Sequence, residues 1–241
     1  MLVIAHRGAS GYAPENTLAA IELALEQKCD GIEIDVQLTK DYEVIVHHDW
    51  NVERTTNGKG EIRDLTLQEI KQLDAGSWFD EKFKGEKILL LEEILETVPK
   101  SILLNIEMKS KATDERELEK KVAGILKKYD RIDNTIISSF NHYSINKIKE
   151  LLPEIKTGIL YEADMIRPVD YVLSNFKEIY SLHPCNDYVG EKFVKMVKEA
   201  NLKIYTWTVN DIFTAGLLSK LGIDGIITNY PDIMKKSIKS I

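Results

Sequence analysis

The stretch Gly31-Ile32-Glu33-Ile34-Asp35-Val36-Gln37 decides the fold. Its branched apolar residues alternate with polar ones at the period of a β-strand, so the apolar residues share one face and Glu33 and Asp35 share the other. Acids that alternate in this way can simply face solvent. If both faces of the strand are covered, however, the acidic face must line the inside of a barrel or an active site.

Strand-like and helical segments alternate along the whole chain. The β-type runs are Leu2–His6, Gly31–Gln37, Ile102–Glu107, Thr135–Phe140, Thr157–Tyr161, Ile179–His183, Lys203–Thr208 and Gly225–Thr228. The helical stretches are Glu15–Gln27, Leu91–Thr97, Glu115–Lys128, Tyr143–Leu152, Glu191–Ala200, Ile212–Lys220 and Pro231–Ile238. This alternation favours the α/β class, and eight strands in 241 residues predict a single (β/α)8 TIM-barrel catalytic domain over residues 1–241. An open doubly wound sheet is the alternative.

The stretch after the second strand breaks this alternation. A further β-type run, Glu43–His48, follows Gly31–Thr39 after Lys40-Asp41-Tyr42, a connection too short for a parallel crossover. The two runs are therefore expected to form a hairpin. Residues 51–87 then hold turn-rich sequence with one short helix, and we interpret them as a small insertion on the catalytic face.

Three carboxylates are expected to converge at one end of the barrel. Glu33 and Asp35 share a strand face, and Glu107 ends the next barrel strand. Buried carboxylates repel each other unless a cation lies between them, and an all-oxygen site suits Mg²⁺ or Ca²⁺ better than zinc. Arg7 and Lys109 are expected to rim the same pocket and to favour an anionic group such as phosphate, although each by itself can be a surface charge.

Two histidines are expected beside this site. His6 ends the first strand, and a two-residue hairpin loop would place His48 opposite residue 33 or 35, on the acidic face. His47 would then lie on the other face, and a three-residue loop would reverse this assignment. A pair of imidazoles beside a cation can act as general acid and general base; metal ligation or simple packing is the alternative.

Composition narrows the classes of partner. The chain has 32 basic and 39 acidic residues, a formal charge of −7, and the basic residues are scattered, so nucleic acid is not an expected partner. No apolar run is long enough for a membrane helix, and the first residues lack the features of a signal peptide, so a cytoplasmic protein without stable membrane insertion is expected. Cys29 and Cys185 are expected to be reduced.

With these residues assembled, the sequence resembles the glycerophosphodiester phosphodiesterase family. The resemblance rests on short segments that occur in the family's order over nearly the whole chain. They are His6-Arg7-Gly8, Pro14-Glu15-Asn16-Thr17, Glu33-Ile34-Asp35, His48-Asp49, Arg54-Thr55-Thr56, Asp74-Ala75-Gly76, Glu107-Met108-Lys109, Ser138-Ser139-Phe140 and Trp207-Thr208-Val209-Asn210.

The resemblance implies a barrel with a small insertion, and hydrolysis of glycerophosphodiesters to sn-glycerol 3-phosphate and an alcohol. Carried over by position, the roles are metal binding for Glu33, Asp35 and Glu107, catalysis for His6 and His48, and substrate binding for Arg7, Lys109, Phe140 and Trp207. The implied cofactor is one divalent cation, Mg²⁺ or Ca²⁺, and the implied partner is a small-molecule substrate. The oligomeric state, monomer or homo-oligomer, stays open.

The chain departs from the family pattern at two places. Ile88-Leu89-Leu90-Leu91-Glu92-Glu93 stands where the family often has Ile-Pro-Thr-Leu-Glu-Glu, and Thr228-Asn229 stands where it often has Thr-Asp. Neither departure is expected to touch the metal or the histidines.

Mechanism and substrate range are open at this stage. His6 is expected to be the base and His48 the acid, with water or the glycerol 2-hydroxyl as nucleophile. A lysophospholipase D-like activity on lipid-bearing diesters is the alternative, and a non-catalytic binding module is disfavoured because no expected chemical residue is missing. Trp78, Phe79 and Phe83 of the insertion can either rim the pocket and select the alcohol or pack among themselves.

Overall fold

A computed structural model describes residues 1–111, 113 and 116–238 of the chain. Its parallel strands close into a barrel because β1 pairs with both β9 and β2. The strands are β1 (Leu2–His6), β2 (Gly31–Leu38), β4 (Leu103–Met108), β5 (Thr135–Ser139), β6 (Lys156–Tyr161), β7 (Ser181–Pro184), β8 (Lys203–Thr206) and β9 (Gly225–Thr228). This closed order confirms the (β/α)8 barrel and excludes the open doubly wound sheet.

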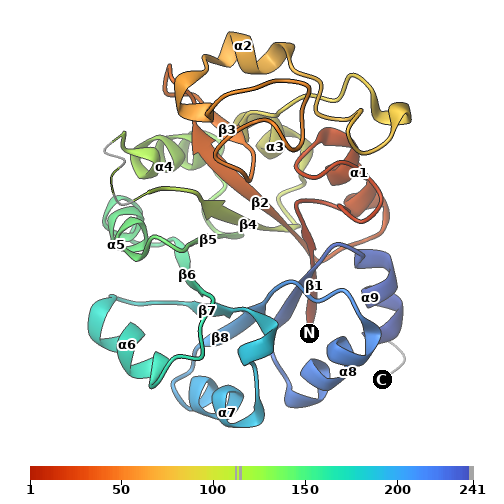
Figure 1. Ribbon diagram of the computed structural model, residues 1–241. Coiled ribbons are helices and arrows are strands. Elements are labelled where there is room, and N and C mark those ends of the chain that lie inside the picture. Colours follow the sequence, from red (N-terminus) through yellow and green to blue (C-terminus); the bar gives the residue numbers. More distant parts are fainter. Residues whose placement is uncertain (112, 114–115, 239–241) are drawn as a thin grey trace.

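Helices surround the barrel, as Figure 1 shows. They are α1 (Leu18–Glu26), α3 (Leu91–Thr97), α4 (Leu118–Lys128), α5 (His142–Leu151), α6 (Pro168–Asn175), α7 (Glu191–Glu199), α8 (Ile212–Leu221) and α9 (Pro231–Ile238). The sequence patterns give no helix at α6, which is short and begins at a proline directly after Arg167 in left-handed conformation. The residue Glu115, at which the α4 helix was expected to begin, lies outside the described residues.

The alternation in β2 has the expected consequence. Every residue of β2 is buried, so the strand is covered on both faces. Ile32 and Ile34 belong to the apolar layer between the barrel and its helices, whereas Glu33 and Asp35 are on the opposite face, inside the barrel. A smaller apolar cluster that includes Ile4 lies apart from this layer. The acids of β2 are thus held inside the barrel.

The hairpin is antiparallel, but its loop has three residues rather than two. Val36 pairs with Val46 of β3 (Val44–Val46), and Lys40, Asp41 and Tyr42 connect the strands. Tyr42 adopts a positive φ of 64°, and the Thr39 hydroxyl oxygen accepts a hydrogen bond from the Glu43 amide at 3.0 Å. These local features stabilise the longer turn, so the two-residue loop expected from the sequence is wrong.

The chain between β3 and α3 packs around an apolar cluster of its own. This segment carries α2 (Leu67–Gln72) and the 3₁₀ turns Ile62–Asp64 and Glu81–Phe83, and a third such turn, Asn186–Tyr188, precedes α7. The members of the cluster are Ile45, Val52, Ile62, Ile70, Ala75 and Ile88. Because Ile45 belongs to β3, the cluster joins the segment to the hairpin. The bounds 51–87 of the insertion stay a prediction.

None of the helices in the described part of the chain is both long and apolar enough to cross a membrane.

Candidate active site

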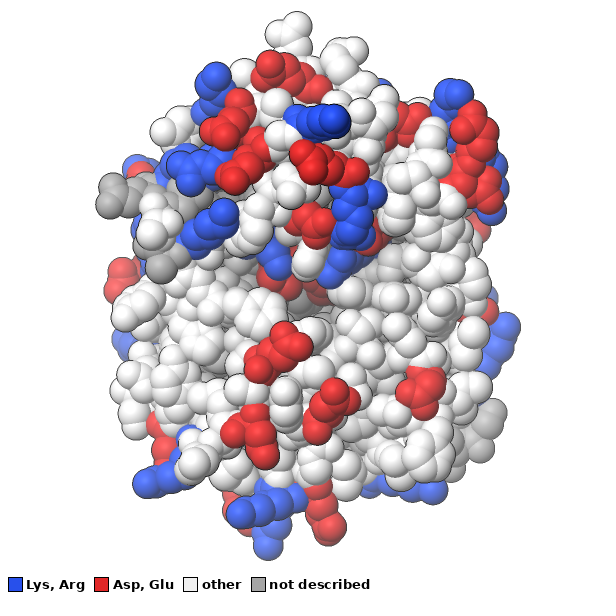
Figure 2. Space-filling view, viewed as in Figure 1, with Lys and Arg blue, Asp and Glu red and all other residues white. Residues whose placement is uncertain are grey.

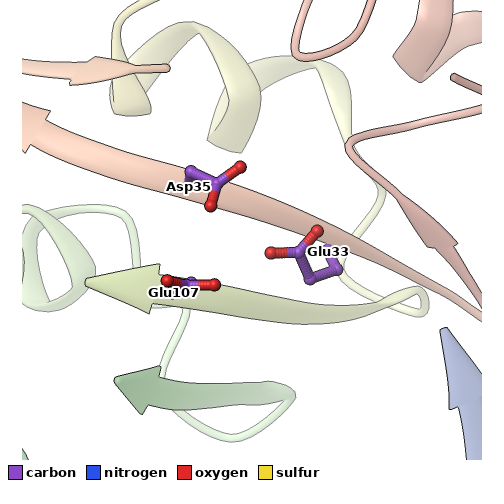
Figure 3. Close-up of side chains that lie close together, drawn as sticks. All are labelled: Glu33, Asp35 and Glu107. Carbon is purple, nitrogen blue, oxygen red and sulfur yellow. The ribbon is translucent and has the colours of Figure 1, made fainter. Parts of the chain in front are cut away.

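The three predicted metal ligands come together inside the barrel. Glu33 and Asp35 lie on β2 and Glu107 on β4, where the strand register places Asp35 beside Glu107. One carboxylate oxygen from each residue lies within 4.8 Å of the other two, and Figure 3 shows the three groups pointing toward one another. All three side chains are almost fully buried. Such a cluster is unfavourable unless positive charge or protons balance it.

The pKa values of the three carboxyl groups reflect this crowding of negative charge. Burial, followed by the charges of Asp35 and Glu107, raises the pKa of Glu33 well above its usual value. Burial and Asp35 likewise raise the pKa of Glu107 to about 7. Burial acts on Asp35 in the same direction, but the nearby charges, first that of Arg7 at 3.2 Å and then those of His48 and Lys109, together with a hydrogen bond from Asn16, outweigh it and lower the pKa of Asp35.

A divalent cation fits this donor set. Among the described residues, Asp35 Oδ1 is buried and accepts no hydrogen bond, and the Oδ1 atom of Asn105, the neighbour of Glu33 on β4, is likewise buried without a partner. The cluster has three carboxylates, and the cations near it are Arg7 and Lys109, the latter 2.8 Å from Glu107. Unpartnered oxygens among carboxylates are the hard ligands that Mg²⁺ and Ca²⁺ take.

The predicted catalytic histidines face the same pocket. This pocket has a volume of about 100 Å³ and is lined by His6, Arg7, Glu33, His48, Asn105, Glu107, Ser138, Phe140, Leu160, Trp207, Thr208 and Ile227. It lies at the carboxyl ends of the strands, and Figure 2 shows the hollow with charged side chains crowded on the side of the insertion. A larger depression of about 470 Å³, between the β6–α6 connection and α7, is lined by neither of these histidines nor by any of the three clustered carboxylates.

Each histidine has one ring nitrogen held by a neighbouring side chain. His6 Nδ1 is 2.7 Å from Asn229 Oδ1, and His48 Nδ1 is 2.6 Å from Asp49 Oδ1. Burial lowers the pKa of His6 to about 4, and burial also lowers the pKa of His48. His6 is therefore unprotonated at neutral pH, as a general base must be.

The expectation that Thr228-Asn229 would not touch the histidines is wrong. β9 lies beside β1 in the closed barrel, so Asn229 reaches His6 although the two residues are 223 positions apart. Sequence patterns do not give this contact, because it depends on which strands close the barrel. The sequence nevertheless marks this position, because Asn229 stands where the family often has aspartate.

His48 lines the pocket, but the strand pairing of the hairpin is not what places it there. The observed pairing places residue 47, not 48, opposite Asp35, and the amide of His47 donates to the Asp35 carbonyl at 2.9 Å. β3 ends at Val46 and the chain then bends, so strand alternation no longer decides where the side chains point. His47 is buried and bonds Thr55 Oγ1 at 2.9 Å, whereas His48 lines the pocket.

The predicted substrate-binding residues lie around the same hollow. Phe140 is 45% exposed and contacts Trp207 edge to face, with 5.6 Å between the ring centroids. Lys109 Nζ is 6.0 Å from the Phe140 ring centroid. The site therefore combines charge on one side with an aromatic wall on the other.

The aromatic residues of the insertion do not line this pocket. The Phe79 ring contacts Trp78 at 5.6 Å and Phe83 at 5.7 Å between centroids, and the Trp78 indole donates to the Ala75 carbonyl. Of the two roles left open by the sequence, the contacts favour packing among themselves.

The family model described as the glycerophosphoryl diester phosphodiesterase family matches residues 6–233. The chain belongs to this family. It is 45% identical over 234 residues to a glycerophosphodiester phosphodiesterase of Caldanaerobacter subterraneus, covering 97% of this chain and 96% of that protein. It is 38% identical to a glycerophosphodiester phosphodiesterase of Bacillus subtilis, covering 98% of this chain and 86% of that protein.

Solved structures agree with this family membership. A phosphodiesterase of Oleispira antarctica, solved in complex with the product sn-glycerol 3-phosphate, superposes with a TM-score of 0.93 at 34% identity. The match covers 99% of this chain and 97% of that one. A glycerophosphodiester phosphodiesterase of Agrobacterium tumefaciens has a TM-score of 0.85 at 27% identity, covering 98% and 99%.

Proposed function

We propose that this enzyme hydrolyses glycerophosphodiesters to sn-glycerol 3-phosphate and an alcohol, with a divalent cation and two catalytic histidines. The observation that carries the proposal is the convergence of the carboxylates Glu33, Asp35 and Glu107 with His6 and His48 at one pocket. The product-bound relative from Oleispira antarctica supports the glycerophosphate half of the substrate.

Glu33, Asp35 and Glu107 would hold the cation, which we expect to be Mg²⁺ or Ca²⁺. Such an ion, when bound, supplies positive charge that offsets the negative charge of a phosphodiester as the bond to the leaving group breaks. Arg7 and Lys109 add fixed positive charge at the same place. Burial lowers the pKa of Lys109, but Glu107 and Asp35 outweigh it and raise that pKa, so the ammonium stays charged.

His6 would take the proton from the nucleophile. With Asn229 Oδ1 accepting from Nδ1–H, its Nε2 carries the free lone pair. His48 would give a proton to the departing alcohol, and the Asp49 carboxylate at its Nδ1 stabilises the charged imidazolium that this role requires. Phe140 and Trp207 would exclude water from one side of the bound substrate.

The test is release of sn-glycerol 3-phosphate from glycerophosphocholine, measured with a coupled glycerol 3-phosphate dehydrogenase assay. We expect turnover with Mg²⁺ or Ca²⁺, loss of turnover in excess EDTA, and recovery when either ion is restored. Full activity of metal-stripped protein in EDTA would overturn the metal requirement. Lysophosphatidylcholine, assayed in parallel by choline release, tests the lipid-bearing alternative.

The nucleophile can be identified from the product. Attack by the glycerol 2-hydroxyl gives a cyclic phosphate before the final product, whereas attack by water does not. Phosphorus NMR during turnover detects the cyclic species, and its absence at every time point supports direct attack by water. A cytoplasmic location stays a prediction.

A further inference from the structure

Arg54, in the insertion, donates hydrogen bonds to two carboxylates at once. Its Nε and Nη2 atoms donate to the two oxygens of Asp49 at 2.6 and 3.0 Å. Its Nη1 and Nη2 atoms donate to the two oxygens of Glu15 at 2.9 and 2.8 Å. This is the paired, planar geometry that a guanidinium group provides and an ammonium group does not.

Each of the two carboxylates also contacts a residue of the pocket. Glu15 Oε1 accepts from Arg7 Nη1 at 2.7 Å, and Asp49 Oδ1 lies 2.6 Å from His48 Nδ1. The contacts form one continuous series: Arg7, Glu15, Arg54, Asp49, His48. Its members come from the β1–α1 connection, from the turn after β3 and from the insertion.

The two carboxylates of the series are ionised. Burial raises the pKa of Glu15, but the hydrogen bonds from Arg54 and the charge of Arg7 outweigh it and lower that pKa to about 2. The hydrogen bonds from Arg54 are the main cause of the low pKa of Asp49. Within the part of the chain that the structure describes, His48 and Arg54 are the side chains that bond the Asp49 carboxylate.

We propose that Arg54 is a positioning residue for the reaction, which fixes the Asp49 carboxylate and, through it, the ring orientation and tautomer of His48. The same guanidinium holds Glu15 against Arg7, so the insertion is tied to both the histidine and the arginine of the pocket. This inference rests on the proposed function, because it assigns Arg54 a task in that reaction.

A structural role for Arg54 is the competing explanation, and exposure separates the two. The Arg54 side chain is 44% exposed, the Asp49 side chain 25% and the Glu15 side chain 14%. Ion pairs with an exposed partner contribute little to stability, and the less exposed Glu15 keeps its bond to Arg7 when Arg54 is lost. Loss of Arg54 should therefore appear in turnover and in the state of the His48 ring, with only a small change in Tm.

The kinetic experiment compares Arg54→Met, Arg54→Lys and the control Arg63→Met on glycerophosphocholine. Arg63 is an exposed arginine of the same insertion and lies in a separate small depression with Glu61 and Lys111. Residues that orient a reacting group typically change rates by about 10–100-fold. We expect kcat to fall by that factor in Arg54→Met, to recover partly in Arg54→Lys and to be unchanged in Arg63→Met.

The spectroscopic experiment follows the His48 ring directly. Nitrogen NMR of ¹⁵N-histidine-labelled protein at pH 8, where histidine is neutral, reports the tautomer; the His48 signals are assigned by their loss in His48→Gln. We expect a protonated Nδ1 in the native enzyme and shifts toward a tautomer mixture in Arg54→Met.

Two results would overturn the inference. One is native kcat in Arg54→Met. The other is a lowered kcat while the His48 nitrogen shifts stay at their native values, which would mean that Arg54 acts by another route. If the native enzyme does not hydrolyse glycerophosphocholine, the proposed function fails, whereas the NMR comparison still tests the link from Arg54 to His48.

Discussion

Replacing Asn229 by aspartate should move the working pH range of the enzyme. Asn229 Oδ1 lies 2.7 Å from His6 Nδ1, and the pKa of His6 is lowered to about 4 by burial and then by Arg7. A carboxylate at this position would place a negative charge beside the imidazole. This negative charge would stabilise the protonated imidazole more than the neutral amide does, so it would raise the pKa of His6.

The size of the shift follows from the geometry. Two unit charges about 4 Å apart interact by about 4 kcal/mol at an effective dielectric constant of about 20. Because one pKa unit corresponds to about 1.4 kcal/mol, Asn229→Asp should raise the pKa of His6 by up to about three units, from about 4 toward 7. As a general base His6 must be unprotonated, so the variant should lose about 10-fold in kcat/KM for each pH unit below its new pKa.

The assay is kcat/KM for glycerophosphocholine between pH 4.5 and 8.5 at constant ionic strength, together with an NMR titration of His6. Asn229→Ala is the matched control, since it removes the hydrogen-bond acceptor without adding charge. We expect the acid limb of the profile to rise in Asn229→Asp and not in Asn229→Ala. Coincident acid limbs for Asn229→Asp and the native enzyme would refute the assignment of His6 as the base.

Three further predictions follow from burial and charge. Glu33→Gln relieves the repulsion among the buried carboxylates, so it should raise the Tm of the metal-free protein by about 2–4 °C for each kcal/mol of repulsion relieved. The same variant should bind Mg²⁺ or Ca²⁺ more weakly in calorimetry. A lower Tm than that of the native protein without metal would contradict the excess of negative charge in the cluster. His48→Ala should lose about 10²–10⁴-fold in kcat with a near-native Tm, because His48 lines the pocket. His47→Ala should lower the Tm, because it removes a buried side chain that bonds Thr55. The opposite pattern in activity assays and melting curves would reverse the roles of the two residues. Burial lowers the pKa of His183 to about 3, so protonation of this residue favours the unfolded chain. The free energy of unfolding that a neutral His183 contributes is complete above about pH 6.5 and should fall by at most about 5 kcal/mol as the pH drops toward 3. Urea unfolding at about pH 4.5 and 7 should show a smaller pH dependence in His183→Gln than in the native protein, and an equal dependence would argue against a neutral buried His183.

Strand positions were predictable from the sequence because they depend on local pattern. The bounds of β1 and β9 agree with their predicted runs, and the other barrel strands differ from theirs by no more than two residues at either end. The helix α6 was not predictable, because eight residues that begin at Pro168 give little periodic signal.

The candidate site divides in the same way. Glu33 and Asp35 were placed correctly inside the barrel, because a strand covered on both faces leaves its acids no other environment. The loop of the hairpin was not, because two- and three-residue turns are both compatible with the same alternating strands, and local bonds at Thr39 and Tyr42 choose between them.

The sequence by itself determined the alternation of strands and helices, the strand ends that carry the site and the chemical groups available there, since these follow from periodicities of two and 3.6 residues; closure of the sheet into a barrel came from the pairing of β1 with β9 and β2. Only the tertiary structure decided which groups touch. Barrel closure brings Asn229 onto His6, and the turn after β3 together with the insertion brings Arg54 between Glu15 and Asp49. Such contacts join residues far apart in the chain, and they depend on backbone bends that no local pattern encodes.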